Sequence, residues 1–203
     1  QFNAEIRALI LERASEGFDW KDISPTIFGA VFESTLNPET RRAGGMHYTS
    51  IENIHKVIDP LFLDDLKAEF QDICTIAQPK TKRNKLDAFQ HKLATIVCLD
   101  PAAGSGNFLT ETYLSLRRLE NQVLKERLDG QMTMGDEELN PIQVSIQQFY
   151  GIEINDFAVT VAKTALWIAE SQMLEETKSL VYGFNQDFLP LKTYVNITEG
   201  NAL

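Results

Sequence analysis

Over roughly the first ninety residues, hydrophobic positions recur every three or four residues, the spacing of one face of an α-helix. One predicted helix begins at Ser24-Pro25, where a serine N-cap precedes a proline at the first helical position. A second begins at Thr49-Ser50-Ile51-Glu52, which has the spacing of a capping box, and Pro60 interrupts it or opens the next. The apolar faces are Ile27, Phe28, Val31 and Phe32, then Ile51, Ile54 and Ile58, then Leu63, Leu66, Phe70 and Ile73. We therefore predict a helical N-terminal lobe over residues 1–92.

Beyond this lobe the pattern changes to short apolar runs separated by long helical stretches. Thr95–Leu99 is rich in β-branched residues and is predicted to be a buried strand; Phe149–Ile154 and Tyr194–Ile197 are predicted as the next two. Asp156 is expected to cap the helix before the third strand. That helix has a stripe of small residues that would let it lie close to a sheet: Ala158, Ala162, Ala165 and Ala169. Alternating strands and helices predict an α/β domain with a parallel sheet over residues 93–203.

The polar stretch Gln78–Lys85 carries four basic residues and is predicted to be a solvated linker between the two parts, with phosphate contact as the alternative. The chain as a whole is acidic, with a formal net charge of -10. This charge argues against the chain gripping DNA by itself, because phosphate contacts dominate nucleic-acid affinity.

The remaining composition is ordinary for a soluble globular protein, with 43% hydrophobic and 24% charged residues. No apolar run approaches the roughly 20 residues that span a bilayer, so no membrane association is expected. Cys74 and Cys98 are far apart and are expected to be reduced, which suits a cytoplasmic protein. Neither they nor the three histidines have metal-ligand spacing, so no metal site is expected.

Three polar features follow the predicted strands: the loop Asp100–Phe108 after the first, Glu153 after the second and Asn201 after the third. In an open parallel sheet, ligands bind outside the carboxyl ends of the strands. These three features are therefore the candidate ligand site.

The glycine loop has two interpretations. A dinucleotide-binding loop reads G-x-G-x-x-G, and Gly104 and Gly106 fit it, but Leu109 stands where the third glycine belongs. Asp100 would also repel a pyrophosphate. A ligand with an ammonium group and no phosphate suits Asp100 better, with its carboxylate at the backbone amides of the helix N-terminus. S-adenosylmethionine is such a ligand.

Glu153 could accept hydrogen bonds from both ribose hydroxyls of that ligand. Its separation from Asp100 far exceeds the roughly 20 residues usual in dinucleotide folds; the intervening long helix and polar loop account for the excess. Asn201 could bond an adenine edge. The alternatives are a solvated carboxylate at a strand end and an ordinary loop asparagine.

Four segments in this order resemble the amino-methylating DNA methyltransferases of the γ arrangement: Gly45–Thr49, Asp100–Leu109, Gly151–Asn155 and Glu199–Leu203. The stretch Pro25–Glu33, with His47–Ser50 and Asp59–Leu63, is similar to the MmeI-like branch, and this resemblance covers roughly residues 18–203. It implies a truncated Rossmann-like class I methyltransferase core, dependent on S-adenosylmethionine, behind the helical lobe. It also implies a type II restriction-modification system of bacteria and double-stranded DNA as partner through the full-length protein.

The resemblance also implies a role for each cofactor residue. Tyr48 and Thr49 would contact the methionine end, and Asp100 with the amides around Gly104 and Gly106 would hold its amino and carboxylate groups. Glu153 would take the ribose. The rest of the cofactor-binding set is Pro101, Ala102, Asn107, Phe108, Ile154 on the adenine face and Asn201 at the adenine edge. Two positions depart from many relatives, which have proline in place of Ser50 and aspartate in place of Asn201.

The catalytic motif of this family is Asn/Asp-Pro-Pro-Tyr/Phe, and no two prolines are adjacent in the chain. In the family's order it would lie beyond Leu203, so the chain is expected to hold no catalytic residue and to be inactive alone. The implied reaction is methylation of an exocyclic amino group in a specific DNA sequence, most of all N6 of adenine. Alternatives are an amino-methyltransferase of RNA or of protein glutamine, and a nucleotide-dependent oxidoreductase or binding module. Cytosine-C5 chemistry is disfavoured because neither cysteine follows a proline.

Overall fold

A computed structural model describes residues 3–9, 11–12, 23–35, 49–128, 141–181 and 195–202. Its centre is a parallel sheet of β1 (Cys98–Asp100), β2 (Phe149–Glu153) and β3 (Asn196–Glu199), in the order β1-β2-β3. Leu99 lies opposite Tyr150, and Gly151 lies opposite Ile197. The predicted α/β architecture with a parallel sheet is confirmed.

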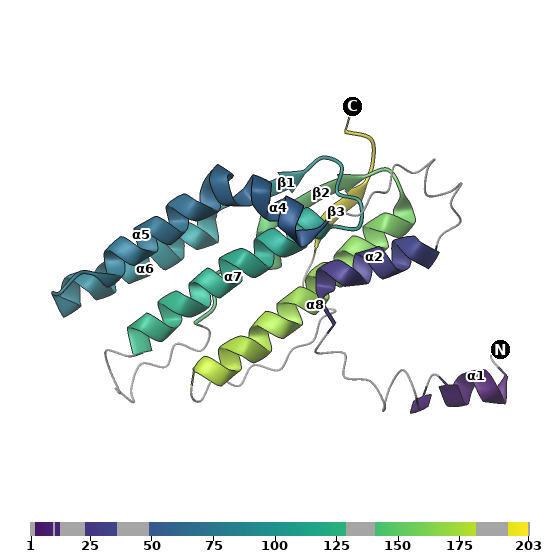
Figure 1. Cartoon of the computed structure of the whole chain (residues 1–203), viewed down its shortest axis with the longest axis horizontal. Helices are drawn as coiled ribbons and strands as arrows, with labels where there is room; N and C mark the ends of the chain where they lie inside the picture. Colours follow the sequence, from purple (N-terminus) through teal and green to yellow (C-terminus); the bar gives the residue numbers. More distant parts are fainter. Residues whose placement is uncertain are drawn as a thin grey trace.

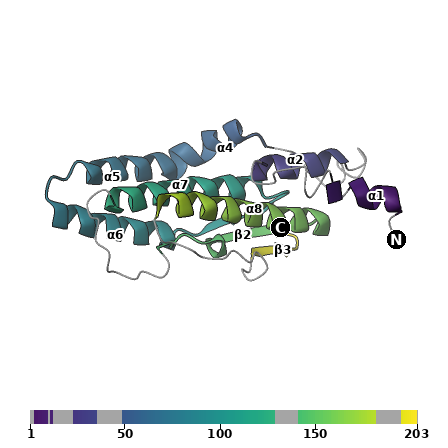
Figure 2. The same cartoon turned by 90° about the horizontal axis from the view of Figure 1, so that it is seen from below.

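The helices form two layers on one side of this sheet (Figures 1 and 2). The connecting helices α7 (Asn107–Leu128) and α8 (Asp156–Leu180) lie against the strands. The outer layer contains α2 (Pro25–Thr35), α4 (Ile51–Ile58) and α5 (Asp64–Cys74). The remaining elements are α1 (Ala4–Leu9) at one end of the molecule, α6 (Pro79–Thr95) beside α5 and α7, and the short turns η3 (Asp59–Leu63) and η4 (Ile146–Gln148).

One hydrophobic cluster joins the N-terminal helices to the α/β part. Phe70 and Phe89 stack at a centroid distance of 6.0 Å, and Tyr113 of α7 meets Phe149 of β2 edge-to-face at 5.5 Å. All four side chains belong to the same buried cluster. The domain boundary at residue 92 stays a prediction, and apolar contacts cross it.

The predicted linker at Gln78–Lys85 is wrong: this stretch is the first half of α6, with Pro79 in its first turn. Lys82 bonds Glu126 of α7 there. The apolar face of α6 begins only at Leu86 and continues through Phe89 and Leu93, all buried. The first two turns therefore carry no apolar pattern, and the proline start was the available signal.

Element boundaries differ from the predictions by a few residues. Thr95 ends α6 rather than opening a strand, and β3 begins at Asn196 rather than at residue 194. The N-caps are Ser50, which accepts from Asn53 N, and Asn155, which accepts from Ala158 N, in place of the predicted Thr49 and Asp156. The caps are one residue off because neighbouring residues, Thr49 with Ser50 and Asn155 with Asp156, are both good N-caps.

The first strand is also more exposed than predicted. Leu99 is 62% exposed and Tyr150, its neighbour on β2, is 42% exposed. The connecting helices cover the opposite face of the sheet, where Phe149 and Ile197 are buried. Leu99 and Tyr150 point to the other face, because successive side chains of a strand alternate.

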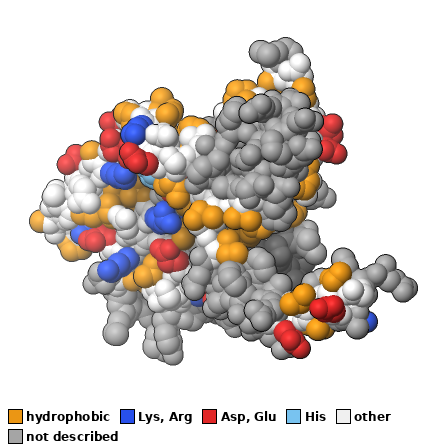
Figure 3. Space-filling model, turned by 45° about the vertical axis from the view of Figure 1, so that its right-hand side comes forward, with side chains coloured by type: hydrophobic (Ala, Val, Ile, Leu, Met, Phe, Trp, Pro, Cys, Tyr) orange, Lys and Arg blue, Asp and Glu red, His pale blue; other side chains and the backbone are white. Residues whose placement is uncertain are grey.

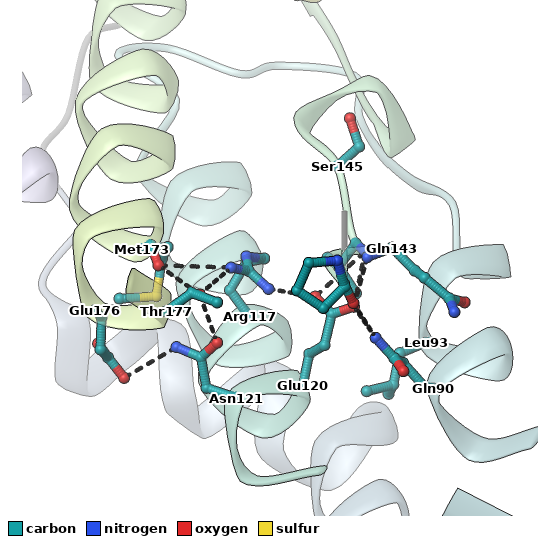
Figure 4. A network of polar contacts seen from close by, with 12 residues as sticks. Gln90, Leu93, Arg117, Glu120, Asn121, Gln143, Ser145, Met173, Glu176 and Thr177 are labelled. Atoms are coloured by element: carbon teal, nitrogen blue, oxygen red, sulfur yellow. Dashed lines mark hydrogen bonds and ion pairs between the residues drawn. The ribbon is translucent and has the colours of Figure 1, made fainter. Parts of the chain in front are cut away.

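A buried polar network fixes the chain that enters β2 (Figure 4). Arg117 and Glu120, both on α7, form an ion pair that is almost fully buried. Glu120 Oε1 accepts from Gln143 N at 2.7 Å and from Gln90 Nε2 at 2.8 Å. Arg117 Nη2 donates to Thr177 Oγ1 of α8 at 2.7 Å. The network therefore links α6, α7 and α8 to the segment that leads into β2.

Candidate cofactor site

A cavity of about 730 Å³ lies at the carboxyl ends of the three strands. The loop after β1, the end of β2 and residues 200–202 after β3 line it. Thr49, just before α4, lines it from the outer helical layer. This is the position at which open parallel α/β sheets bind their ligands.

Most of the residues predicted to bind a cofactor meet in this cavity. Tyr48 lies outside the described residues, and Gly106 is not among the lining residues. The other predicted residues all line the cavity: Thr49, Asp100, Pro101, Ala102, Gly104, Asn107, Phe108, Glu153, Ile154 and Asn201.

The two glycines of the loop serve different purposes. Both have positive φ, +53° at Gly104 and +79° at Gly106, which favours glycine. A Cβ at Gly104 would meet nothing within 4 Å, whereas one at Gly106 would lie 2.8 Å from the Cβ of Ala162. Gly106 therefore lets the loop pack on α8, and Gly104 leaves room at the cavity wall.

Glu153 ties the glycine loop to the sheet. Its Oε2 accepts from Gly104 N at 2.8 Å, and its Oε1 accepts from Asn155 N at 2.9 Å. The residue is 7% exposed and still lines the cavity. Because each carboxylate oxygen has two lone pairs, both oxygens retain acceptor capacity toward a ligand.

Asp100 is the last residue of β1 and the first residue of the same loop. Its Oδ1 accepts from Ala102 N at 3.0 Å, which orients the carboxylate. Burial raises the pKa of Asp100 above its ordinary value, and the negative charge of Glu153 raises it further, although the bond from Ala102 opposes both. A cationic ligand group beside Asp100 would relieve this unfavourable environment.

Two further lining residues have the character of ligand contacts. Among the described residues, Asn107 Oδ1 is buried without a hydrogen-bond partner, in the first turn of α7. Ile154 is apolar yet 64% exposed, at the end of β2. A polar ligand group at Asn107 and a flat apolar group on Ile154 would satisfy both side chains.

Several lining residues were not predicted individually: Ala103, Ser105, Ile152, Gly200 and Ala202. All of them adjoin predicted residues at a strand end. Ala103 N donates to Ile152 O at 3.0 Å, and Gly200 N donates to Glu153 O at 2.9 Å, so both loops are fastened to β2. Ile152 precedes Ile154 by two residues, and side chains two residues apart in a strand point to the same face. This spacing was the available signal for Ile152.

A second cavity of about 720 Å³ adjoins the first and shares Asp100, Pro101 and Phe108 with it. Exposed hydrophobic side chains line it from η3 and β1, among them Leu61 at 70% and Leu99 at 62% exposed. It is the more apolar of the two hollows.

The described ranges contain no cluster of three or more His, Cys, Asp or Glu side chains suited to a metal ion. No helix among them is long and apolar enough to cross a membrane. On the face drawn in Figure 3, the described basic and acidic side chains lie interspersed.

The chain folds as an α/β domain with a cavity at the carboxyl ends of its strands, and comparisons identify its relatives. Residues 76–203 match the family model of the MmeI DNA-methyltransferase domain. The chain is 44% identical over its whole length to DNA methyltransferase A of Bacillus subtilis. It is 29% identical, over 93% of its length, to a putative type II restriction enzyme and methyltransferase of Methanocaldococcus jannaschii.

The fold is also similar to a solved structure. The type IIL restriction-modification enzyme MmeI, determined in complex with DNA, superposes with a TM-score of 0.82 at 40% identity and covers the whole chain. The chain belongs to the MmeI DNA-methyltransferase family. It spans 22% and 17% of the two curated relatives and 26% of the MmeI chain.

Proposed function

We propose that this chain forms the S-adenosylmethionine-binding part of a cytoplasmic, site-specific DNA methyltransferase of a restriction-modification system, with a Rossmann-like class I core. The observation that carries the proposal is the convergence of the loop Asp100–Phe108, Glu153, Ile154 and Asn201 on one cavity. Family membership supports the same conclusion, since the matched family is a DNA-methyltransferase domain. One curated relative is named a DNA methyltransferase, and the other a putative type II restriction enzyme and methyltransferase.

The lining residues fit this cofactor group by group. The Asp100 carboxylate would hold its ammonium, and the first-turn amides of α7 would hold its carboxylate end. Glu153 would accept from the ribose hydroxyls, Ile154 would cover the adenine and Asn201 would meet its edge. When bound, the sulfonium would supply an activated methyl group, so that catalysis is chiefly positioning.

The proposed acceptor is an exocyclic amino nitrogen, N6 of adenine, in double-stranded DNA. In enzymes that work on a base inside a duplex, the target is first rotated out of the stack. The chain contains no pair of adjacent prolines, and hence no Asn/Asp-Pro-Pro-aromatic motif. We therefore propose that residues outside these 203 perform the transfer, and that this chain alone does not methylate DNA.

Calorimetry with S-adenosylmethionine and with NAD tests the cofactor assignment. Asp100→Asn should weaken S-adenosylmethionine binding by roughly ten- to a hundredfold, because it removes a charge-assisted hydrogen bond. Asp72→Asn, on the exposed face of α5, is the control and should bind as the wild type does. Binding of NAD alone would overturn the assignment. For the substrate, methyl transfer to duplex DNA by the full-length protein should label adenine; label on RNA or protein only would refute it.

A further inference from the structure

A second cluster of ionisable groups is centred on α7, one turn beyond the cofactor loop, and includes residues of α4, η3 and α5. It does not line the cavity. Its central residue is Glu111, which is only 3% exposed. Glu111 Oε1 lies 3.2 Å from His55 Nε2 of α4 and 3.6 Å from Arg118 Nη1, and Glu111 Oε2 accepts from Thr26 Oγ1 of α2 at 3.4 Å. A buried carboxylate is costly unless it is paired and hydrogen-bonded, so this junction holds α2 and α4 against α7.

His55 faces a carboxylate on each side of its ring. Nδ1 lies 2.8 Å from Asp59 Oδ1, and Asp59 in turn lies 3.7 Å from Lys67 Nζ of α5. Only the doubly protonated imidazolium can donate to both carboxylates, because the neutral ring carries a single N–H. The bond with Asp59 raises the pKa of His55 most, and the bond with Glu111 adds to it against the opposing effect of burial.

The junction accounts for sequence motifs that the cavity leaves unused. Thr26 belongs to the stretch Pro25–Glu33 and Asp59 to the stretch Asp59–Leu63, and neither Thr26 nor Asp59 lines the cofactor cavity. Thr26 bonds Glu111 and Asp59 bonds His55, so each contacts one member of the Glu111–His55 pair. His55 lies on the short helix α4, which begins directly after Thr49 and Ser50, and Thr49 does line the cavity.

We infer that Glu111 and His55 are positioning residues for the methyl-donor cavity: their contact holds α4 on α7 and so keeps Thr49 beside the loop Asp100–Phe108. The inference rests on the proposed function, because the ligand is the one assigned above. Neither residue touches the cavity, so each acts through the placement of α4. The groups facing His55 are Asp59 and Glu111, with Lys67 and Arg118 behind them.

The test measures the dissociation constant of S-adenosylmethionine from pH 6 to pH 8.5 in the wild type, His55→Gln and Glu111→Gln. His91→Gln is the matched control, since His91 is an exposed histidine on α6. At pH 6 both variants should bind about three- to tenfold more weakly than the wild type. This is the size of effect expected when a partly buried ion pair is lost. Their disadvantage should shrink as the pH rises and His55 loses its proton in the wild type. Titration of the ligand's own amino group is common to all variants and cancels.

Hydrogen exchange on the same proteins separates positioning from folding. Amides of residues 51–58 should exchange faster in His55→Gln and Glu111→Gln, and not in His91→Gln. Faster exchange with unchanged affinity would show that the junction is only structural and would overturn the inference, as would wild-type affinity at every pH. Failure of the wild type to bind S-adenosylmethionine at all would instead refute the proposed function. His55 is partly exposed, so its variant should fold even if Glu111→Gln does not.

Discussion

The amide of Gly104 donates to Oε2 of Glu153 across 2.8 Å, so the turn after β1 is bonded to the end of β2. This bond links two residues that are 49 positions apart in the chain. It means that Glu153 has a structural task as well as its proposed contact with the ribose. Changes at either residue should therefore affect both stability and ligand binding.

Glu153→Gln should lower the free energy of unfolding by about 1–2 kcal/mol, because one buried acceptor becomes an amide group facing a backbone N–H. Urea unfolding followed by circular dichroism measures this loss. Glu199→Gln is the control, since Glu199 is paired in register with Glu153 but exposed. Equal stability of the two variants would contradict the role assigned to the Gly104–Glu153 bond.

Alanine at the two loop glycines should have unequal effects. Gly104→Ala should lower the free energy of unfolding by about 1–2 kcal/mol, because of the positive φ alone; open space surrounds the added Cβ. Gly106→Ala has a similar conformational cost, and its added Cβ also clashes with Ala162, so it should be the more destabilising. Thermal unfolding of both variants checks the order. A Gly104 variant at least as unstable as the Gly106 variant would show that the contact with α8 is easily relaxed.

The candidate site was predictable because its residues follow strands. Parallel strands bring their carboxyl ends to one edge, so Asp100, Glu153 and Asn201 could be placed together from the sequence alone. Local pattern also located each strand to within a few residues. These signals need only neighbours along the chain and one topological rule.

Other features depend on contacts between distant segments and left no local trace. Thr26 and Glu111 are 85 residues apart, and neither spacing nor composition connects them. The basic residues of Gln78–Lys85 suggested a loop, although the helix that contains them is stabilised by an apolar face further along. The close packing of Gly106 on Ala162 depends on how α8 is placed, so no local pattern indicated it, and its contact with the cofactor stays a prediction.

The buried pair Arg117–Glu120 should be among the most sensitive polar sites in the molecule. Glu120→Ala leaves a buried guanidinium without its charge partner and frees the amide of Gln143, and should cost about 3–5 kcal/mol. Urea unfolding is the measurement. The matched control is Glu126→Ala, which removes the partner of Lys82 at a partly exposed position and should cost much less. A small loss for Glu120→Ala would mean that the network in Figure 4 is replaceable.

Cys98 should react slowly with thiol reagents. Burial raises the pKa of Cys98 to about 11, so very little thiolate exists at neutral pH. Alkylation by iodoacetamide at pH 7.5, followed by mass spectrometry of peptides, should modify the native protein far more slowly than the unfolded protein at this residue. Burial raises the pKa of Cys74 as well, to a lesser extent. Rapid labelling of native Cys98 would indicate that β1 opens readily.

The pH dependence of stability should follow His55 and Asp59. The pKa of His55 is raised above 6.5, so its stabilising contribution is complete below pH 6.5 and is lost as the pH rises through the raised value. The pKa of Asp59 is lowered below 3.8 by its bond with His55, so that contribution is complete above pH 3.8 and is lost in more acidic solution. The His55–Asp59 contact should therefore stabilise the fold most between these limits. Urea unfolding at pH 6 and pH 8.5 measures this effect. The free energy of unfolding of His55→Gln should lie about 0.5–1 kcal/mol below that of the wild type at pH 6, and markedly less below it at pH 8.5. His91→Gln should show no such difference. A loss for His55→Gln that is the same at both pH values would mean that packing of the ring, rather than its charge, secures α4.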